Sequence, residues 1–284
     1  MKEKRIFYLC GLPRAGNTLL STLFNQNPEI SATANSIVTE IFKDLNNLKR
    51  SDTFLNYPDH DSFDNVIKAI VPAYYRDWKK PIIIDRGPWG APNNLAFLKH
   101  YINPKPKIIV LVREVLEVLG SFIEWSNENQ TAFPNRIGCI NVEQKCEALM
   151  NTDGLIIKEL IAIKHLTLPQ NEGIALFIDY NDLVKEPEKT LKKIYKFLDI
   201  PYYNKHNYTK LGQFEVNGRG YDDKVVGDNL HTIKTKGINK TKRNLEKLLP
   251  KTIIDKYKNL NELWKWKYLY LDYQDQEKLH LLKN

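Results

Sequence analysis

Four short apolar runs recur along this chain of 284 residues, and each is separated from the next by a longer stretch with helical periodicity. The runs are Arg5–Cys10, Pro81–Asp85, Lys107–Arg113 and Ile174–Asp179. Strands that alternate with helices predict a parallel sheet, because each crossover lays a helix over one of its faces. We therefore expect an α/β, P-loop-like fold of three layers, with a central parallel sheet flanked by helices. In such sheets ligands bind beyond the carboxyl ends of the strands.

Apolar residues at helical spacing predict the helices between these runs. The expected helices are Gly16–Asn27, Ser36–Leu48, Ser62–Arg76, Ala91–Tyr101, Val115–Asn127, Asn141–Leu166 and Pro187–Leu198. We expect a single domain over residues 1–284. Within it, residues 212–242 predict a long loop, and loops of that length are commonly functional or mobile. Residues 243–284 predict a helical tail whose aromatic residues favour packing on the domain over a nucleic-acid platform. The aromatic residues that stand out are Trp264, Trp266, Tyr268 and Tyr270.

The composition is typical of a globular protein with a moderately basic surface. Lysine and arginine number 42 and aspartate and glutamate 34, which gives a formal net charge of +8. No apolar run approaches the ~20 residues that span a bilayer, and no secretory pattern precedes the first run. Cys10, Cys139 and Cys146 match no metal or disulfide spacing, so we expect a soluble, cytoplasmic protein without a metal. The surplus charge predicts a solvated surface or a site for an anion, either a nucleic acid, an anionic membrane or a phosphorylated small molecule.

The loop after the first strand is the first candidate for an anion site. Residues Gly11–Thr18 read GLPRAGNT and lead directly into the first helix. A loop of this kind directs several backbone N–H groups and the positive end of the helix at one point. Its glycines allow close approach of a ligand, and Arg14 can add a charged hydrogen bond. The alternative is a simple turn between a strand and a helix.

The same loop argues against ATP chemistry. A nucleoside-triphosphatase loop reads G-x-x-x-x-G-K-[ST], and here Asn17 stands at the lysine position. Without that lysine, the usual contact with the terminal phosphates is lost. The loop therefore favours a phosphate that carries less charge than the ATP tail.

At this point several blocks together resemble one family. GLPRAGNTLL is similar to the G-x-P-R-S-G-T-T-L-L loop that binds the 5′-phosphosulfate in sulfotransferases. Further blocks follow in order: Asp85–Pro88 resembles D-K-x-P, Lys107–Phe122 resembles the segment that binds the 3′-phosphate, Ile174–Pro201 resembles Y-E-D-L-x-x-x-P…FL-G-x-P, and Asn229–Lys236 resembles L-H-x-[VI]-[RK]. The resemblance covers about Ile6 to Lys236. It is a resemblance to the sulfotransferases that use 3′-phosphoadenylyl sulfate (PAPS), the broad group that includes tyrosylprotein sulfotransferases.

The resemblance implies a role for each matching residue. The backbone of the loop, at Ala15, Gly16, Asn17 and Thr18, would hold the 5′-phosphosulfate of PAPS, and Arg14 and Arg86 would neutralise charge as the bridging bond breaks. Arg113, Ser121, Tyr180 and a lysine from Lys234 or Lys236 would hold the nucleotide and its 3′-phosphate. The product would be 3′,5′-ADP, and this transfer demands no metal. Each side chain also has an ordinary structural use: an ion pair for Arg113, packing for Tyr180, and solvation for the two lysines.

Three departures from the family pattern affect the mechanism. Ala15 and Asn17 replace hydroxyl residues, although Asn17 can replace one of the lost donors. Arg86 replaces a lysine, which keeps the charge but disfavours proton donation. The base glutamate of the tyrosylprotein enzymes falls at Ala34, so that mechanism is in doubt. We take Glu40 as the first candidate for a general base. Asp85, His60 and His100 are weaker candidates.

Two further hypotheses stay open. The altered loop and the missing glutamate allow a non-catalytic nucleotide- or nucleic-acid-binding protein on the same fold. A nucleotide kinase would require ATP turnover despite Asn17. For the enzyme, we expect a small-molecule, peptide or glycan acceptor and neither a nucleic acid nor a membrane as partner. The acceptor itself, and whether the chain forms a homo-oligomer, are left open by the sequence.

Overall fold

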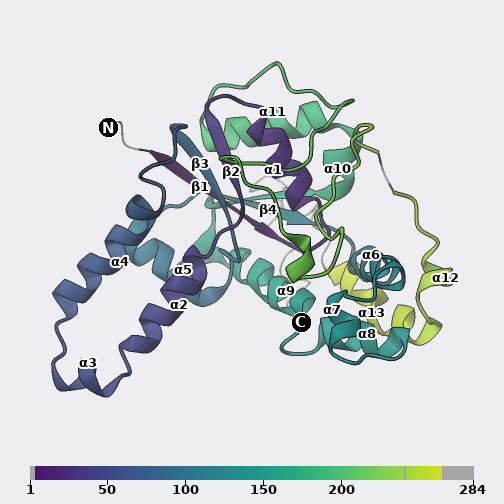
Figure 1. Ribbon diagram of the computed structural model, residues 1–284, viewed down its shortest axis with the longest axis horizontal. Coiled ribbons are helices and arrows are strands. Elements are labelled where there is room, and N and C mark those ends of the chain that lie inside the picture. Colours follow the sequence, from purple (N-terminus) through teal and green to yellow (C-terminus); the bar gives the residue numbers. More distant parts are fainter. Residues whose placement is uncertain (1–3, 240, 264–284) are drawn as a thin grey trace.

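Five parallel strands form the centre of the protein (Figure 1). The computed structural model describes residues 4–239 and 241–263. Across the sheet the strands follow the order β2 (Ile30–Asn35), β3 (Ile82–Arg86), β1 (Arg5–Gly11), β4 (Ile108–Val112) and β5 (Ala175–Asp179). The expected α/β fold with a central parallel sheet and flanking helices is therefore confirmed. The four predicted strands are all present, within one or two residues of their expected ends.

The fifth strand, β2, was not predicted. Its six residues, ISATAN, mostly have small or polar side chains, so the segment lacks the apolar run by which the other strands were recognised. It lies at the edge of the sheet, where only β3 pairs with it, and the register shifts between Ala32 and Asn35. Tertiary pairing, not local propensity, makes this segment a strand.

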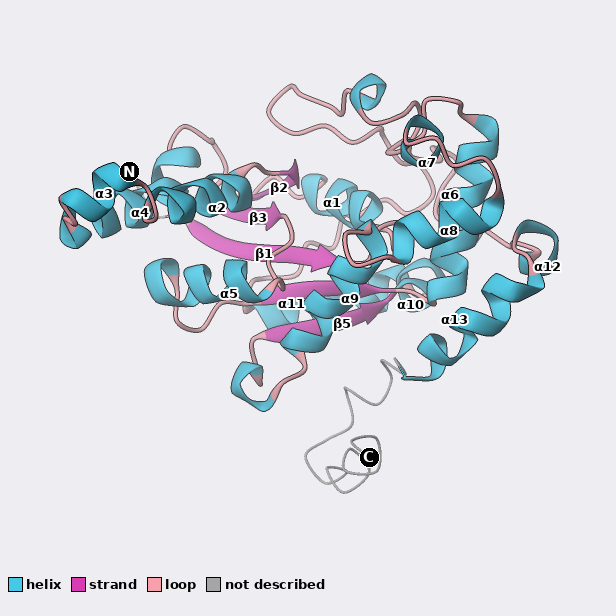
Figure 2. Ribbon diagram, turned by 90° about the horizontal axis from the view of Figure 1, so that it is seen from below, coloured by secondary structure: helices cyan, strands magenta, loops and turns pink. Residues whose placement is uncertain are grey.

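Helices cover both faces of the sheet (Figures 1 and 2). Their bounds in chain order are α1 (Asn17–Asn25), α2 (Val38–Leu48), α3 (Asp52–Asn56), α4 (His60–Tyr74), α5 (Pro92–Phe97), the π-helical turn η1 (Leu98–Ile102), α6 (Val115–Glu128), α7 (Phe133–Arg136), α8 (Val142–Met150), α9 (Leu155–Leu166), η2 (Pro169–Asn171), α10 (Tyr180–Lys185), α11 (Pro187–Leu198), η3 (Asp223–Val225), α12 (Leu245–Leu248) and α13 (Lys251–Leu263). Figure 1 shows α2, α3 and α4 projecting from the sheet as an arm. None of the described helices is both long enough and apolar enough to cross a membrane.

Two predicted helices are divided in the structure. The stretch Asn141–Leu166 forms α8 and α9, and Gly154 stands at the break, where a Cβ would lie 2.3 Å from the Leu149 carbonyl oxygen. The stretch Ala91–Tyr101 forms α5 and η1. In the predicted tail, α12 and α13 are helical, whereas Trp264, Trp266, Tyr268 and Tyr270 lie outside the described residues.

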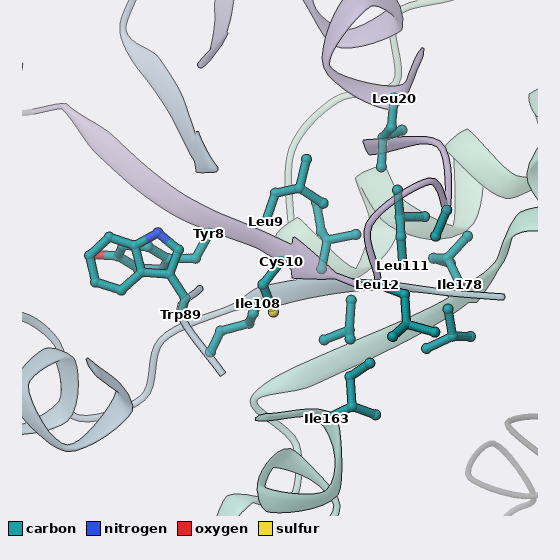
Figure 3. Packing of buried hydrophobic residues seen from close by; sticks show 14 of the residues in the cluster. Tyr8, Leu9, Cys10, Leu12, Leu20, Trp89, Ile108, Leu111, Ile163 and Ile178 are labelled. Carbon is teal, nitrogen blue, oxygen red and sulfur yellow. The ribbon is translucent and has the colours of Figure 1, made fainter. Parts of the chain in front are cut away.

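The core lies on both sides of β1 and β4 (Figure 3). Leu20 of α1 approaches the sheet from one side and Ile163 of α9 from the other. Tyr8 of β1 packs edge-on against Trp89, with ring centroids 4.7 Å apart. Burial of apolar surface on both faces stabilises the sheet and fixes the ends of its strands, where the polar residues lie.

The long loop predicted after residue 212 is largely irregular and contains only the short turn η3 and an isolated bridge between Val216 and Arg219. We call residues 212–239 the strap. The strap crosses the carboxyl edge of the sheet, because its backbone carbonyls accept hydrogen bonds from side chains of the first loop, α6 and α7.

Candidate active site

Two glycines shape the loop between β1 and α1. Gly11 has a φ of 134°, and a Cβ there would lie 2.1 Å from the Leu111 carbonyl oxygen of β4. Gly16 has a φ of 90°, and its missing side chain leaves room for the Tyr180 ring, whose nearest atom would lie 3.1 Å from a Cβ. A side chain at either position would strain the backbone and push the loop away from its neighbours. The loop is therefore held tightly against the ends of β4 and β5.

The helix that follows the loop presents an uncapped N-terminus. Gly16 is the N-cap residue of α1, no side chain caps the helix, and no acidic residue lies in its first turn. The first N–H groups of a helix have no acceptor within the helix, so those of α1 can bind an anion. The sequence analysis expected the Asn17 side chain to replace a hydroxyl donor to the ligand. In the structure its Nδ2 donates to the Leu12 carbonyl oxygen at 2.8 Å. Its side chain therefore braces the loop, and Ala15 beside it is fully buried.

Arg14 stands at the centre of the site. Its backbone has a φ of 60°, a left-handed conformation that is uncommon for residues other than glycine. Its Nε donates to the Ser121 hydroxyl of α6 at 3.0 Å, and another guanidinium nitrogen donates to the Leu230 carbonyl oxygen of the strap at 2.6 Å. The loop, α6 and the strap thus meet at this one side chain.

Arg113 follows β4 and contacts the first loop, α6 and α10. It donates to the Arg14 carbonyl oxygen at 2.8 Å and to Glu117 at 3.0 Å. Its guanidinium carbon lies 4.0 Å from the centre of the Tyr180 ring, within the range of a cation–π contact. The structure therefore brings Arg113, Ser121 and Tyr180, which the sequence analysis selected for the nucleotide end, together with Arg14, which it selected for the phosphosulfate end.

Arg243 is a third arginine near Arg14 and Arg113, and the sequence analysis did not select it. It follows the strap and is almost fully buried, with its Nε donating to Glu124 at 2.9 Å and a terminal nitrogen 3.7 Å from Glu117. Gly120 makes room for Leu245, which lies two residues after Arg243, because a Cβ there would lie 2.7 Å from the Leu245 side chain. The signal in the sequence that could have indicated Arg243 is that it is a single arginine after the lysines that end the long loop. We call Arg14, Arg113 and Arg243 the arginine cluster.

The arginine cluster concentrates positive charge in a poorly hydrated place. Burial, together with the charges of Arg243 and Arg113, lowers the pKa of Arg14 to about 10. Burial also lowers the pKa of Arg113, and the charge of Arg243 contributes to that lowering. Glu117 and Glu124 are the acids that pair with the cluster in the described part of the chain. An anion bound here would relieve the repulsion among three guanidinium groups.

Arg86, at the end of β3, lies on another side of the loop. One of its terminal nitrogens donates to the Thr18 hydroxyl at 3.3 Å and to the Tyr221 hydroxyl of the strap at 2.5 Å. Thr18 belongs to the first turn of α1, so the Arg86 charge lies beside the uncapped helix end. This corner therefore combines a fixed positive charge with backbone N–H donors.

The strap is fastened over these side chains. Trp125 Nε1 donates to the Asp228 carbonyl oxygen at 2.8 Å, and Asn129 donates to the same oxygen at 2.5 Å. Gly227 has a φ of 127°, and a Cβ there would lie 2.7 Å from the Trp125 ring. The strap thus rests on α6 by close contact and reaches Arg14 and Arg86 through Leu230 and Tyr221.

The remaining selected residues lie apart from these contacts. Lys234 and Lys236 are exposed on the strap, and the contact of Lys234 is with Thr241 at 3.4 Å. Glu40 is exposed in the first turn of α2. Asp85 is fully buried and accepts a hydrogen bond from Ser36 at 2.6 Å. No group of three His, Cys, Asp or Glu side chains suited to a metal occurs within residues 4–239 and 241–263.

Glu159 is a half-buried acid that the sequence analysis missed. It lies on the same face of α9 as Ala162 and Leu166. Those two residues pack closely against Gly90. Its Oε2 is buried and has no hydrogen-bond partner among the described residues. Burial raises the pKa of Glu159 to about 7, although the nearby Arg86 charge acts to lower it. An acid on the apolar face of a predicted helix was the available signal.

Comparisons with known proteins find similar sequences and similar folds. A sequence model of the sulfotransferase family matches residues 7–204. A Caenorhabditis briggsae protein, provisionally named as a protein-tyrosine sulfotransferase, is 20% identical over 235 residues, which cover 81% of this chain and 79% of that protein. Among solved structures, the sulfotransferase domain of the Synechococcus PCC 7002 olefin synthase is 17% identical with a TM-score of 0.56 and covers 92% of this chain and 95% of its own. The sulfotransferase domain from the curacin biosynthetic pathway is 17% identical, with a TM-score of 0.48. The match covers 95% of this chain and 93% of that domain.

The match to the family model extends over well more than half of the chain. It contains the glycine loop, Arg86, Arg113, Ser121 and Tyr180, which are the residues that the fold gathers at the carboxyl edge of the sheet. The olefin synthase domain shares the fold along nearly the whole length. Because the family model matches most of its length, the chain belongs to the sulfotransferase family.

Proposed function

We propose that this protein transfers a sulfuryl group from PAPS to a hydroxyl or amine acceptor and releases 3′,5′-ADP. The observation that carries the proposal is the arginine cluster beside the glycine loop, in which three guanidinium groups from separate segments face two carboxylates. A nucleotide with an additional phosphate supplies the missing negative charge. Guanidinium groups also match the geometry of phosphate oxygens.

We assign the two ends of the donor to the two charged parts of the site. Arg113, Arg243 and Ser121 would bind the 3′-phosphate, with Tyr180 beneath Arg113. The first N–H groups of α1, together with Thr18 and Arg86, would bind the 5′-phosphosulfate. Both ends would then be held by rigid strand ends and a helix end, so little reorganisation is needed on binding.

The chemistry follows from this placement. The acceptor oxygen or nitrogen attacks sulfur in line with the bridging oxygen, a bond from the acceptor to sulfur forms, and the bond between sulfur and the bridging oxygen breaks. The electron pair of that bond stays on the leaving 5′-phosphate. By analogy with phosphoryl transfer, the protein mainly positions the groups and stabilises this charge, and Arg86 and the α1 N–H groups suit that task.

The proposal is tested by binding of 3′,5′-ADP to the full chain. We expect 3′,5′-ADP to bind at least tenfold more tightly than 5′-AMP, which lacks the 3′-phosphate. Arg113→Ala should weaken 3′,5′-ADP binding by roughly ten- to a hundredfold and change 5′-AMP binding little, because a charged hydrogen bond of this kind contributes about 1.5–3 kcal/mol. Isothermal titration calorimetry at low ionic strength measures both ligands.

Arg76→Ala is the matched control, because Arg76 is largely exposed and pairs with Asp77 away from the site. This variant should bind 3′,5′-ADP like the unchanged protein. A folded protein that binds neither nucleotide, or equal losses in the two variants, would contradict the assigned site. Release of 3′,5′-ADP from PAPS in the presence of an acceptor panel then distinguishes the enzyme from a non-catalytic nucleotide-binding protein.

A further inference from the structure

A histidine and an aspartate on the strap form a pair that the proposed function has not yet used. His231 Nδ1 lies 2.6 Å from Asp223 Oδ1, and the His231 backbone N–H donates to Asp223 Oδ2 at 2.8 Å. Both carboxylate oxygens of Asp223 are therefore engaged by one residue, which fixes the position of the ring. An aspartate that accepts from Nδ1–H favours the tautomer in which Nε2 carries the lone pair. Nε2 has no hydrogen-bond partner among the residues that the structure describes.

The pair lies beside the corner where sulfuryl transfer is proposed. The His231 ring stacks on the Tyr221 ring with centroids 3.8 Å apart and an angle of 7° between the planes. The Tyr221 hydroxyl accepts from Arg86, which also donates to Thr18. Leu230, the residue before His231, accepts from Arg14 through its carbonyl oxygen. The imidazole is thus one stacked ring away from Arg86 and one residue away from the contact with Arg14.

Burial, more than the surrounding charges, disfavours protonation of this imidazole. Burial lowers the pKa of His231; the Asp223 carboxylate raises it, while the Arg86 and Arg14 guanidinium groups lower it. Together these effects lower the pKa of His231 below its ordinary value. A neutral imidazole with a free Nε2 can accept a proton at neutral pH.

The other acids of the region fit this task less well. Glu40 is exposed on α2 and contacts none of the site residues in the described chain. Asp85 is fully buried and accepts from Ser36, with Tyr75 and Trp89 around it. Glu159 is the one rival, since its Oε2 is buried without a partner in the described residues and its pKa responds to Arg86.

We propose that His231 is the general base for the acceptor and that Asp223 positions it, an inference that rests on the proposed function. The acceptor proton passes to His231 Nε2 while the acceptor oxygen or nitrogen forms its bond to sulfur. The bond from sulfur to the bridging oxygen breaks, and its electrons leave with 3′,5′-ADP. Asp223 stabilises the imidazolium that results. The strap, which carries His231 and contacts Arg14 and Arg86, would thereby also supply a group of the reacting centre.

The first experiment needs no acceptor. Nitrogen-15 NMR of the full chain with 3′,5′-ADP bound should show His231 protonated at Nδ1 and unprotonated at Nε2 at pH 7, with a pKa below 6.5. Asp223→Asn should shift the tautomer or the pKa. An imidazolium at pH 7, or an unprotonated Nδ1, would overturn the assignment. Failure of the protein to bind 3′,5′-ADP at all would instead refute the proposed function on which the assignment rests.

The second experiment uses an acceptor that supports turnover of PAPS. His231→Gln should lower kcat by about 10²–10⁴-fold and change 3′,5′-ADP affinity less than threefold. The acid limb of the kcat profile, where His231 becomes protonated, should disappear in this variant. Added imidazole should restore part of the turnover of His231→Ala, which a merely structural role would not allow. Asp223→Asn should lower kcat by roughly tenfold or more.

Two variants complete the design. Asp222→Asn changes the exposed aspartate that precedes Asp223 on the strap and should leave both the rate and the pH profile unchanged. Glu159→Gln should retain the acid limb. Loss of that limb in Glu159→Gln together with its persistence in His231→Gln would assign the base to α9 and overturn the proposal.

Discussion

At the scale of single residues, the position of Arg86 is informative. It ends β3 and reaches the hydroxyls of Thr18 and Tyr221, so its charge adds to the positive end of α1. Arginine keeps its proton at any physiological pH, whereas lysine can release one. A guanidinium group here can stabilise negative charge on a leaving oxygen without donating its proton to that oxygen.

Substitutions of Arg86 should separate catalysis from binding. Arg86→Met removes the charge and should lower kcat by ~10²–10³, as expected for one preorganised donor at a developing charge. The affinity for 3′,5′-ADP should change much less, because this product lacks the sulfuryl group. Arg86→Lys keeps a charge and should recover part of the rate. Steady-state kinetics and calorimetry measure the two effects, and equal losses in kcat and affinity would assign Arg86 to nucleotide binding alone.

At the scale of elements, α6 has two roles. Its first turns carry Glu117 and Ser121, which contact the arginine cluster, and its later turns carry Trp125, which holds the strap at Asp228. The helix therefore links the proposed nucleotide site to the segment that covers it. Small residues allow this closeness, since Gly120 faces Leu245 and Gly227 faces Trp125.

Removing one strap contact should speed the exit of the nucleotide. Trp125→Phe keeps an aromatic ring but loses the donor to the Asp228 carbonyl oxygen. A neutral hydrogen bond contributes about 0.5–1.5 kcal/mol, so dissociation of 3′,5′-ADP should accelerate by roughly two- to tenfold. Stopped-flow displacement measures this rate. Phe122→Leu, which alters the neighbouring ring without removing a donor, is the control, and an equal acceleration in this variant would attribute the effect to packing.

At the scale of the whole molecule, the apolar core contains a carboxyl group that titrates unusually. Asp85 is fully buried in the core; burial raises its pKa to about 6, and Ser36, Tyr75 and Trp89 act in the opposite direction. The folded protein therefore binds this proton more tightly than the unfolded chain, whose ordinary value is 3.8. The stabilisation is complete below that value and is lost as the pH rises through about 6.

Asp85→Asn should expose this dependence. The unchanged protein should lose roughly 2 kcal/mol of unfolding free energy from this group between pH 4 and pH 7, whereas the variant should lack that contribution. The variant should therefore become more stable relative to the unchanged protein as the pH rises. Urea unfolding at intervals across this range measures the difference. Asp44→Asn, at an exposed position of α2, should show no such trend, and a constant offset for Asp85→Asn would argue against a raised pKa.

The sequence was most informative where a strong apolar run ends in a polar residue. The ends of β1, β4 and β5 could be located from such runs, so the proximity of Arg14, Arg113 and Tyr180 followed from the parallel topology. β2 escaped prediction because it is polar and depends on pairing with β3.

The contacts of the strap lay beyond sequence reasoning for another reason. A loop without periodicity gives no register, so nothing in it showed that Leu230 would meet Arg14 or that Tyr221 would meet Arg86. Arg243 was hidden for the same reason, since its place beside Glu117 and Glu124 depends on the path of the chain before it. For Lys234, Lys236 and Glu40 the assigned roles stay predictions.

The Leu230 carbonyl oxygen of the strap accepts a hydrogen bond from the Arg14 guanidinium, so the protein's own backbone uses part of the donor capacity of this side chain. If the proposed donor also contacts Arg14, one of its oxygens would compete with this backbone oxygen, which could return when the nucleotide leaves. Such an internal competitor would lower the affinity for the spent nucleotide, so a stronger hold at this position would slow repeated turnover.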